Sequence, residues 1–348
     1  MKVPLSPRSC EPFDSLEVAA GLIAETQTAE GEIPWFPGGR TDPWDHVESA
    51  MGLAIGGYPE AARRAFEWLA NAQLADGSWY ASYRRGAPED RTRDANMSSY
   101  IAVGVWQHYL ITHDRTFLKA LWPTVRAAIE FALRLQAPGG AIHWAISPEG
   151  RTDPVALLTG SSSIYMSLKC ALAVADQLGQ RPPGWRRARQ RLGDAIRHRP
   201  HLFNMTKSRY AMDWFYPVLC GAVQGAEAHR RINHLWKKFV IEGQGVRCVS
   251  DQPWVTLAET CELALALSAA GSRELAGIVF GWIRERRFED GTYCCGFTYP
   301  DMTVWPEERI SWTNAAVLMA ADALFGITPA ARLFDHRFWQ GAGTRYRT

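Results

Sequence analysis

The feature that most restricts the fold of this chain is a gapless internal repeat, in which residues 45–79 correspond to residues 259–293. A constant offset of 214 positions aligns acid with acid, glycine with glycine and aromatic with aromatic. Such self-similarity is typical of arrays of helical hairpins, so we expect two copies of one such unit. The matched pairs are Asp45 with Glu259, Glu48 with Glu262, Gly57 with Gly271, Phe66 with Phe280, Trp68 with Trp282, and Asp76-Gly77 with Asp290-Gly291.

The rest of the chain divides into helices of alternating composition. Within each pair the first helix is nearly uncharged and the second carries charges. A helix that is apolar all round is buried, whereas a striped helix faces water. We therefore expect an all-α fold, an (α/α)6 barrel or toroid of six helical hairpins. Its inner helices are predicted near 45–56, 95–112, 162–178, 211–223, 254–270 and 310–325, and its outer helices near 14–27, 59–74, 115–136, 184–197, 225–240 and 272–286.

We find no linker, low-complexity tract or long run of like charge that would divide the chain. Residues 1–348 are therefore expected to form a single toroid domain, with 1–13 and 336–348 as peripheral tails. Little strand is expected beyond short pieces near 141–146 and 292–298.

Composition narrows the function classes. The 348 residues are 47% hydrophobic and 21% charged, enough for a large core. A net charge of +2 gives no case for nucleic acid or an anionic membrane as a partner. No segment has the pattern of a signal peptide or 18 unbroken apolar residues. The seven cysteines include no C-x-x-C pair, so we expect reduced thiols in a cytoplasmic protein.

The stretch 41–48 carries the strongest site signal. Pro43 suits the first turn of a helix, and Asp42 before it can cap the free amides. Asp45 and Glu48 then lie three residues apart on one helical face, beside Trp44. Two acids at a helix N-terminus could simply complement the helix dipole. The return of the acidic pair in the second copy of the repeat favours a functional site.

Polar and aromatic residues recur where each inner helix begins. In a toroid these N-termini converge at one end, so the residues would line a funnel. Carboxylates and amides can bond sugar hydroxyls, and aromatic rings can stack on the apolar face of a pyranose. Some of these residues are expected merely to cap helices. The predicted substrate-binding residues are Trp35, Phe36, Arg40, Asp42, Trp44, His46, Glu48, Asp94, Asn96, Tyr165, Asp213, Trp214, Tyr216, Trp254 and Trp312.

Hydrolysis of a glycosidic bond needs a protonated acid and a second carboxylate. Asp45 and Glu259 come from the first and fifth inner helices, so we expect them to face each other across the funnel. A pair separated by roughly 6.5–9.5 Å would give inversion of configuration. Glu259 has the more apolar flanks and is favoured as the acid, and Glu262, about one turn deeper, is the alternative catalytic glutamate.

Residues 73–79, with the sequence QLADGSW, resemble the Q-W repeat of squalene-hopene cyclases and prenyltransferase-type toroids. That resemblance supports a toroid, in which the motif ties hairpins together, and it keeps an isoprenoid enzyme open as the second hypothesis. The departures count against it, because the chain has no D-x-D-D run for protonating an isoprenoid and no D-D-x-x-D run for binding diphosphate. A non-catalytic carbohydrate-binding toroid is the third hypothesis.

The strings IPWFPGGRTDPWDHVE (33–48), MDWFYP (212–217) and GVRCV (245–249) are more specific. With them, nearly the whole chain resembles an actinobacterial family of methylmannose polysaccharide hydrolases. The resemblance implies an endo-acting, cytoplasmic α-mannoside hydrolase that recycles a partly O-methylated mannan, and it carries Asp45 with Glu259 or Glu262 as the acidic pair. Methyl ethers would explain the many aromatic residues. The expected partner is thus an oligosaccharide or polysaccharide substrate, with no nucleic acid and no membrane.

We expect no metal and no cofactor, since the chain has no H-E-x-x-H motif and no glycine-rich phosphate loop. The sugar and its linkage, endo or exo action and the oligomeric state stay open at this point.

Overall fold

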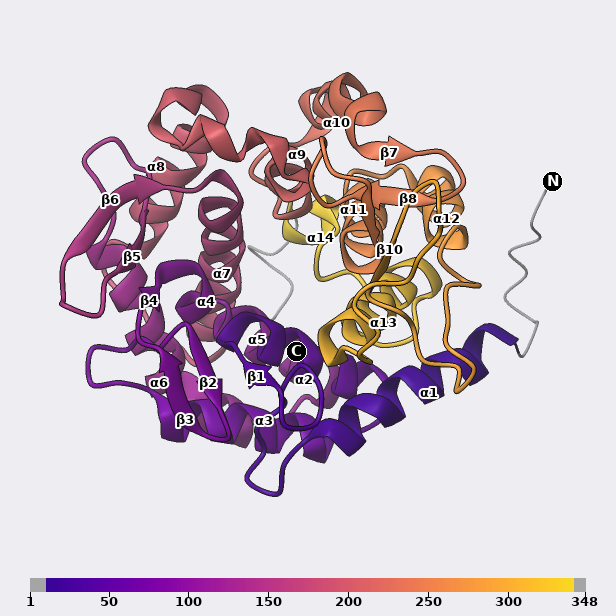
Figure 1. Cartoon of the computed structure of the whole chain (residues 1–348). Helices are drawn as coiled ribbons and strands as arrows, with labels where there is room; N and C mark the ends of the chain where they lie inside the picture. Colours follow the sequence, from indigo (N-terminus) through magenta and orange to yellow (C-terminus); the bar gives the residue numbers. More distant parts are fainter. Residues whose placement is uncertain (1–10, 341–348) are drawn as a thin grey trace.

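The computed structural model describes residues 11–340 and is predominantly helical. Its centre is a closed ring in which each helix packs on the next and the last packs on the first, as Figure 1 shows. The ring members are nearly apolar all round, which is why they lie inside. In ring order they are α2 (Pro43–Ile55), α4 (Ala95–Ser99) continued by α5 (Ile101–Thr112), α7 (Leu158–Gln177), α9 (Ala211–Leu219), α11 (Leu257–Ala269) and α13 (Ser311–Phe325).

A second set of helices surrounds the ring, as Figure 1 shows. These helices present charged residues to water. The alternation predicted from composition is confirmed, with helix ends shifted by a few residues. The expected helix 95–112 is divided at Tyr100, which ends α4 and begins α5. The surrounding helices are α1 (Glu11–Thr26), α3 (Pro59–Ala72), α6 (Arg115–Arg134), α8 (Trp185–His198), α10 (Gly225–Phe239) and α12 (Arg273–Gly281), and two short 3-10 helices, Pro200–Leu202 and Met205–Arg209, lie between α8 and α9.

Three glutamines tie neighbouring outer helices together, which is the structural role that the Q-W resemblance implies. Each side-chain amide donates to the carbonyl of the glycine four residues later and to a carbonyl of the next outer helix, over 2.9–3.1 Å. Each glycine has a positive φ, and a Cβ on it would lie 2.2–2.5 Å from a backbone oxygen of that helix. The sets are Gln27 with Gly31 and Ala61, Gln73 with Gly77 and Thr124, and Gln136 with Gly140 and Ala188.

Short antiparallel strands precede the inner helices and form a rim at their N-terminal end. β1, β4, β6 and β9 each end within two residues of an inner helix. The strands expected near 141–146 and 292–298 correspond to β5 and β10, whereas the other strands were not expected. The sheets are β1 (Arg40–Thr41), β2 (Ser82–Arg84) and β3 (Ala87–Asp90); β4 (Arg93–Asp94), β5 (His143–Ile146) and β6 (Thr152–Ala156); and β10 (Gly296–Thr298), β9 (Trp254–Thr256), β8 (Gly245–Arg247) and β7 (Val240–Ile241).

The C-terminal segment covers the opposite end of the ring. The buried ring of His336, on α14 (His336–Gln340), bonds the carbonyl of Val218 near the end of α9 over 2.7 Å. The ammonium of buried Lys169 lies 4.6 Å from the ring centroid of Trp339. Residues 336–340 therefore pack on this end of the ring, where a peripheral tail was expected. Residues 1–10 and 341–348 of the predicted tails lie outside the described residues.

Candidate active site

The N-terminus of α2 has the cap that its sequence predicts. Asp42 caps the helix, accepting from the backbone N–H of Asp45 over 2.9 Å, and Pro43 occupies the first turn. The other carboxylate oxygen of Asp42 accepts from the indole N–H of Trp35 over 2.9 Å. The guanidinium of Arg40 lies 3.9 Å above the ring of Trp35. Asp42, Trp35 and Arg40 together therefore hold the start of this helix at the rim.

One turn deeper, the carboxylate of Glu48 is a buried acceptor for three aromatic side chains. The indole of Trp44 and the hydroxyl of Tyr100 both donate to Oε1 over 2.9 Å. The indole of Trp312 donates to Oε2 over 2.5 Å. Trp312 is 264 residues away in sequence and reaches Glu48 from α13. This carboxylate therefore fixes aromatic rings from three parts of the inner ring around one point.

The second copy of the acidic pair lies at the start of α11, where β9 runs into the helix. The hydroxyl of Tyr216, from α9, donates to Oε1 of Glu262. The Oε2 atoms of Glu259 and Glu262 are buried and have no hydrogen-bond partner among residues 11–340. Buried polar atoms are nearly always paired, so a free carboxylate oxygen at a helix N-terminus is available to a ligand.

The ring order corrects one geometric prediction. Helix α13 packs between α2 and α11, so Asp45 and Glu259 flank α13 instead of facing each other across the ring. The charges of both acids act on the thiol of Cys295. Burial, and then the nearby charges of Glu259 and Asp45 among others, raise the pKa of Cys295 to about 12.

Burial and mutual repulsion change the titration of these acids. Burial, and then the charges of Asp42 and Glu48, raise the pKa of Asp45 well above its usual range. Burial raises the pKa of Glu48 to about 7, against the lowering effect of its three donors. Burial and the charges of Glu48 and Glu259 raise the pKa of Glu262. These upward shifts favour the protonated form of the carboxyls, which acid catalysis requires.

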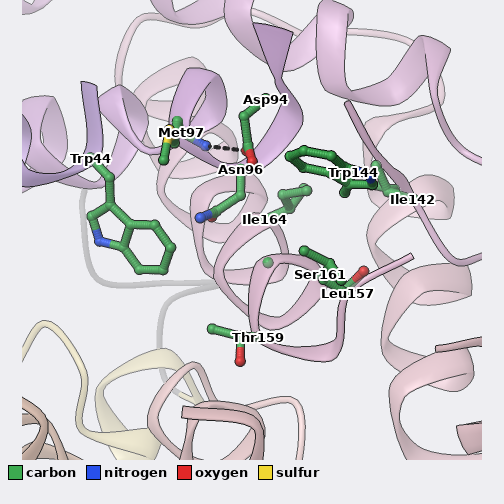
Figure 2. Close-up of a pocket in the computed structure, with 11 residues that line it drawn as sticks. Trp44, Asp94, Asn96, Met97, Ile142, Trp144, Leu157, Thr159, Ser161 and Ile164 are labelled. Carbon is green, nitrogen blue, oxygen red and sulfur yellow. Dashed lines mark hydrogen bonds between the residues drawn. The ribbon is translucent and has the colours of Figure 1, made fainter. Parts of the chain in front are cut away.

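A cavity of about 120 Å³ opens beside Trp44, as Figure 2 shows. It brings together three of the predicted residues, Trp44, Asp94 and Asn96. Asp94 caps α4 by accepting from the N–H of Met97, and burial raises the pKa of Asp94 to about 6. Residues at the start of α4 and at the start of α2 therefore line the same cavity.

Asp213 adjoins this cavity through Thr159, one of the residues that line it. The carboxylate of Asp213 accepts from the hydroxyl of Thr159 over 2.6 Å and from its backbone N–H over 3.1 Å. Asp213 thus links α9 to α7 at the rim.

The side chains of three predicted sugar-binding residues are engaged by other parts of the protein. Both ring nitrogens of buried His46 are used by backbone groups of Ile33 and Ala65, and burial lowers the pKa of His46 to about 4. The ring of Trp214 is buried against α10, and its N–H donates to a carbonyl of that helix. Tyr165 lies against α8 beneath a guanidinium of that helix. Since these three side chains pack against other helices, the structure corrects their placement in the funnel.

The remaining predicted aromatics divide between the rim and the centre. Phe36 is half-buried in the loop that precedes β1. Trp254, on β9, donates its indole N–H to the carbonyl of Trp305 over 2.9 Å. The ring of Tyr216 packs edge-on against Trp44, with centroids 5.7 Å apart. Tyr216 therefore belongs to the aromatic group around the acids, and Trp254 to the rim.

Two residues outside the list of predicted substrate-binding residues are brought to this region by the fold. Tyr100 binds Glu48, a contact between two inner helices that no local pattern records. Trp144 lines the cavity from β5, two positions after Ile142. The alternation of Ile142 and Trp144 in an expected strand was the available signal, since such residues share one face.

Among residues 11–340, no cluster of His, Cys, Asp and Glu could hold a metal ion. Within the same range, none of the helices combines the length and the hydropathy of a membrane span. No family model matches the chain.

Solved structures share the fold over almost its whole length. A glycosidase in complex with glucose superposes with a TM-score of 0.70 and 15% identity, covering 92% of this chain and 100% of that one. A GH63 mannosylglycerate hydrolase from Thermus thermophilus superposes with a TM-score of 0.68 and 13% identity, covering 87% of this chain and 99% of that one. A D-mannose isomerase superposes with a TM-score of 0.71 and 10% identity, covering 92% of this chain and 98% of that one. An isomerase among them shows that the fold alone does not decide the reaction.

Similarity to a curated relative shows the class of reaction. The chain is 49% identical over 330 residues, or 95% of this chain and 90% of the relative, to the MMP endo-(1,4)-3-O-methyl-alpha-D-mannosidase of Mycolicibacterium hassiacum. The acid-lined ring is thus that of a glycoside hydrolase, and the isoprenoid and non-catalytic alternatives are set aside. The chain belongs to the family of that endo-mannosidase.

Proposed function

We propose that this enzyme cleaves internal α-(1,4) bonds of a mannan that carries 3-O-methyl groups. The supporting observation is the 49% identity, over 95% of the chain, to a relative named for that activity. The aromatic residues held around Glu48 agree with such a substrate, because rings can contact both pyranose faces and methyl ethers.

We further propose that the ring and its surrounding helices form an (α/α)6 barrel and that residues 1–348 are a single domain. The continuous packing around the ring supports both statements. A cytoplasmic location is proposed on the free thiols of Cys170, Cys220 and Cys261, among others.

For the reaction we propose inversion, with Asp45 as general acid and Glu259 as general base. This assignment reverses the one favoured from the flanking residues. Burial, and then the carboxyls of Asp42 and Glu48, raise the pKa of Asp45 and so favour its protonated form. Glu259 has a buried oxygen without a partner among the described residues, which can accept a proton. Asp45 protonates the glycosidic oxygen while Glu259 takes a proton from the water that attacks the anomeric carbon from the opposite face.

In this proposal Glu262 is not the base, because it lies deeper and one of its oxygens is engaged by Tyr216. Glu48 and Glu262 form the floor of the site. Glu48 positions the rings of Trp44 and Trp312, and through them the sugar.

The test is to incubate the protein with 3-O-methylated α-(1,4)-manno-oligosaccharides and to follow the anomer first released by proton NMR. We expect internal cleavage and a β-configured product, which is the outcome of inversion at an α-mannoside. An initial α-product would reject inversion, and absence of cleavage would reject the substrate. Plain α-mannan and α-glucan oligosaccharides of equal length are the comparison substrates.

A further inference from the structure

The cavity beside Trp44 has mainly apolar walls although it opens among polar helix N-termini. Figure 2 shows the side chains that surround it, contributed by α2, α4, β5 and α7 and the residues next to them. Indole rings, a thioether and branched aliphatic groups make most of its surface. These apolar residues are Trp44, Met97, Ile142, Trp144, Leu157 and Ile164.

The polar groups of this cavity fall into two kinds. Asp94 and Thr159 already bond the protein, to a backbone N–H of α4 and to Asp213. The side-chain oxygens of Asn96 and Ser161 are buried and have no hydrogen-bond partner among the described residues. Asn96 is 5% exposed and Ser161 is 2% exposed. Buried polar atoms without partners are costly, so these two oxygens indicate a polar ligand.

We propose that this cavity binds a 3-O-methylated mannosyl unit and that Met97 and Trp144 select for its methyl group. The inference rests on the proposed function and adds the place where the methyl ether is recognised. A methyl ether cannot donate a hydrogen bond and gains from apolar contact. A free hydroxyl in the same position would lose its water without finding a partner. Asn96 and Ser161 bond neighbouring hydroxyls of the same ring.

The position of the cavity fits this role. Trp44 forms one wall, precedes Asp45 in sequence and donates its indole N–H to Glu48. A sugar in the cavity therefore contacts Trp44, which adjoins the proposed acid in sequence and bonds Glu48. The volume of about 120 Å³ admits a methyl ether with part of a pyranose, while the remainder of the polysaccharide stays outside.

The experiment compares kcat/KM for methylated and unmethylated α-(1,4)-manno-oligosaccharides of equal length. Met97→Gln keeps the size of the side chain and removes its apolar character. We expect the ratio of the two kcat/KM values to fall roughly tenfold, the scale of one methyl group in an apolar pocket. Met97→Leu is expected to keep most of the ratio. Met205→Gln, at a methionine 61% exposed and outside the cavity, is the matched control and should leave the ratio unchanged.

Two results separate this inference from the proposed function. Cleavage by the wild type with an unchanged ratio in folded Met97→Gln would overturn the methyl-binding cavity and leave the hydrolase standing. Failure of the wild type to cleave either mannan would overturn the proposed function itself.

A second measurement does not depend on the folding of Met97→Gln. In full-length Asp45→Asn with ¹³C-methyl methionine, the Met97 signal should shift on titration with methyl 3-O-methyl-α-D-mannopyranoside, and shift less with methyl α-D-mannopyranoside. An equal response to both glycosides, or none to the first, would overturn the proposal.

Discussion

The two copies of the repeat place acids at matching positions, but the ring surrounds them differently. In α2, Glu48 accepts from three aromatic side chains, and Asp45 stands beside two further carboxyls. In α11, Glu262 is bonded by Tyr216, and one buried oxygen of Glu259 has no partner among the described residues. Equivalent positions in a repeat therefore need not have equivalent chemistry, because the neighbours come from different helices. This difference is what separates a proton donor from a proton acceptor in our proposal.

The sharpest test of the comparison is to neutralise one acid in each copy. Asp45→Asn and Glu259→Gln should each lower kcat by about 10²–10⁴-fold, the contribution of a general acid or base. Glu262→Gln, the same change one turn deeper, should cost less. Initial rates on the methylated oligosaccharide measure these losses, with circular dichroism as the check on folding. Full activity in either of the first two variants would contradict the pair.

The turn glycines offer a comparison in stability. Gly77 and Gly291 both have positive φ. A Cβ on Gly77 would clash with a backbone oxygen of Ala127 at 2.2 Å, whereas a Cβ on Gly291 would lie 3.4 Å from a methyl of Val18, an ordinary contact. Gly291→Ala should cost about 1–2 kcal/mol of unfolding free energy, from left-handed strain alone. Gly77→Ala adds overpacking and should cost at least about 3 kcal/mol. Urea unfolding measures both, and equal losses would contradict the difference in packing.

The raised pKa of Glu48 predicts a pH effect on stability. Its pKa is about 7 in the folded state against 4.5 ordinarily, so the folded protein binds this proton more tightly. The stabilising contribution of Glu48 to the free energy of unfolding is complete below about pH 4.5 and is lost as the pH rises through 7. Glu48→Gln lacks this loss, so its stability relative to the wild type should improve over that interval by roughly 1–3 kcal/mol. Denaturant unfolding at about pH 5 and about pH 8 tests the sign, and a relative loss at the higher pH would refute it.

The smallest expected effects come from the two tyrosines. Tyr216→Phe removes the hydroxyl that bonds Glu262, whereas Tyr100→Phe leaves Glu48 with two indole donors. A buried acceptor left without a partner costs about 1–3 kcal/mol, so Tyr216→Phe should destabilise more than Tyr100→Phe. Thermal unfolding of the two variants under the same conditions measures the two losses of stability. A larger loss in Tyr100→Phe than in Tyr216→Phe would count against the comparison.

Much of the fold could be predicted because its signals are local. Charge on one face marks the outer helices, and the Asp42-Pro43 cap places the start of α2. The gap between α4 and α5 and the rim strands other than β5 and β10 could not be predicted, because segments of two to five residues seldom show a clear period.

The candidate site could be predicted less evenly. The repeat marks the acids, but an inner helix that is apolar all round has no stripe to show which way a side chain points. For that reason the sequence places Trp214 and Tyr165 in the funnel, although they face the outer helices.

By itself the sequence determined the hairpins, their division into inner and outer helices, and the positions of the four acids, since each follows from residues close together in the chain or from the repeat. Only the tertiary structure decided that α13 lies between the two acidic helices, that Trp312 reaches Glu48 across 264 residues, and that Trp144 closes a cavity beside Trp44. Contacts of this kind join distant segments, and no local pattern of residue types records them.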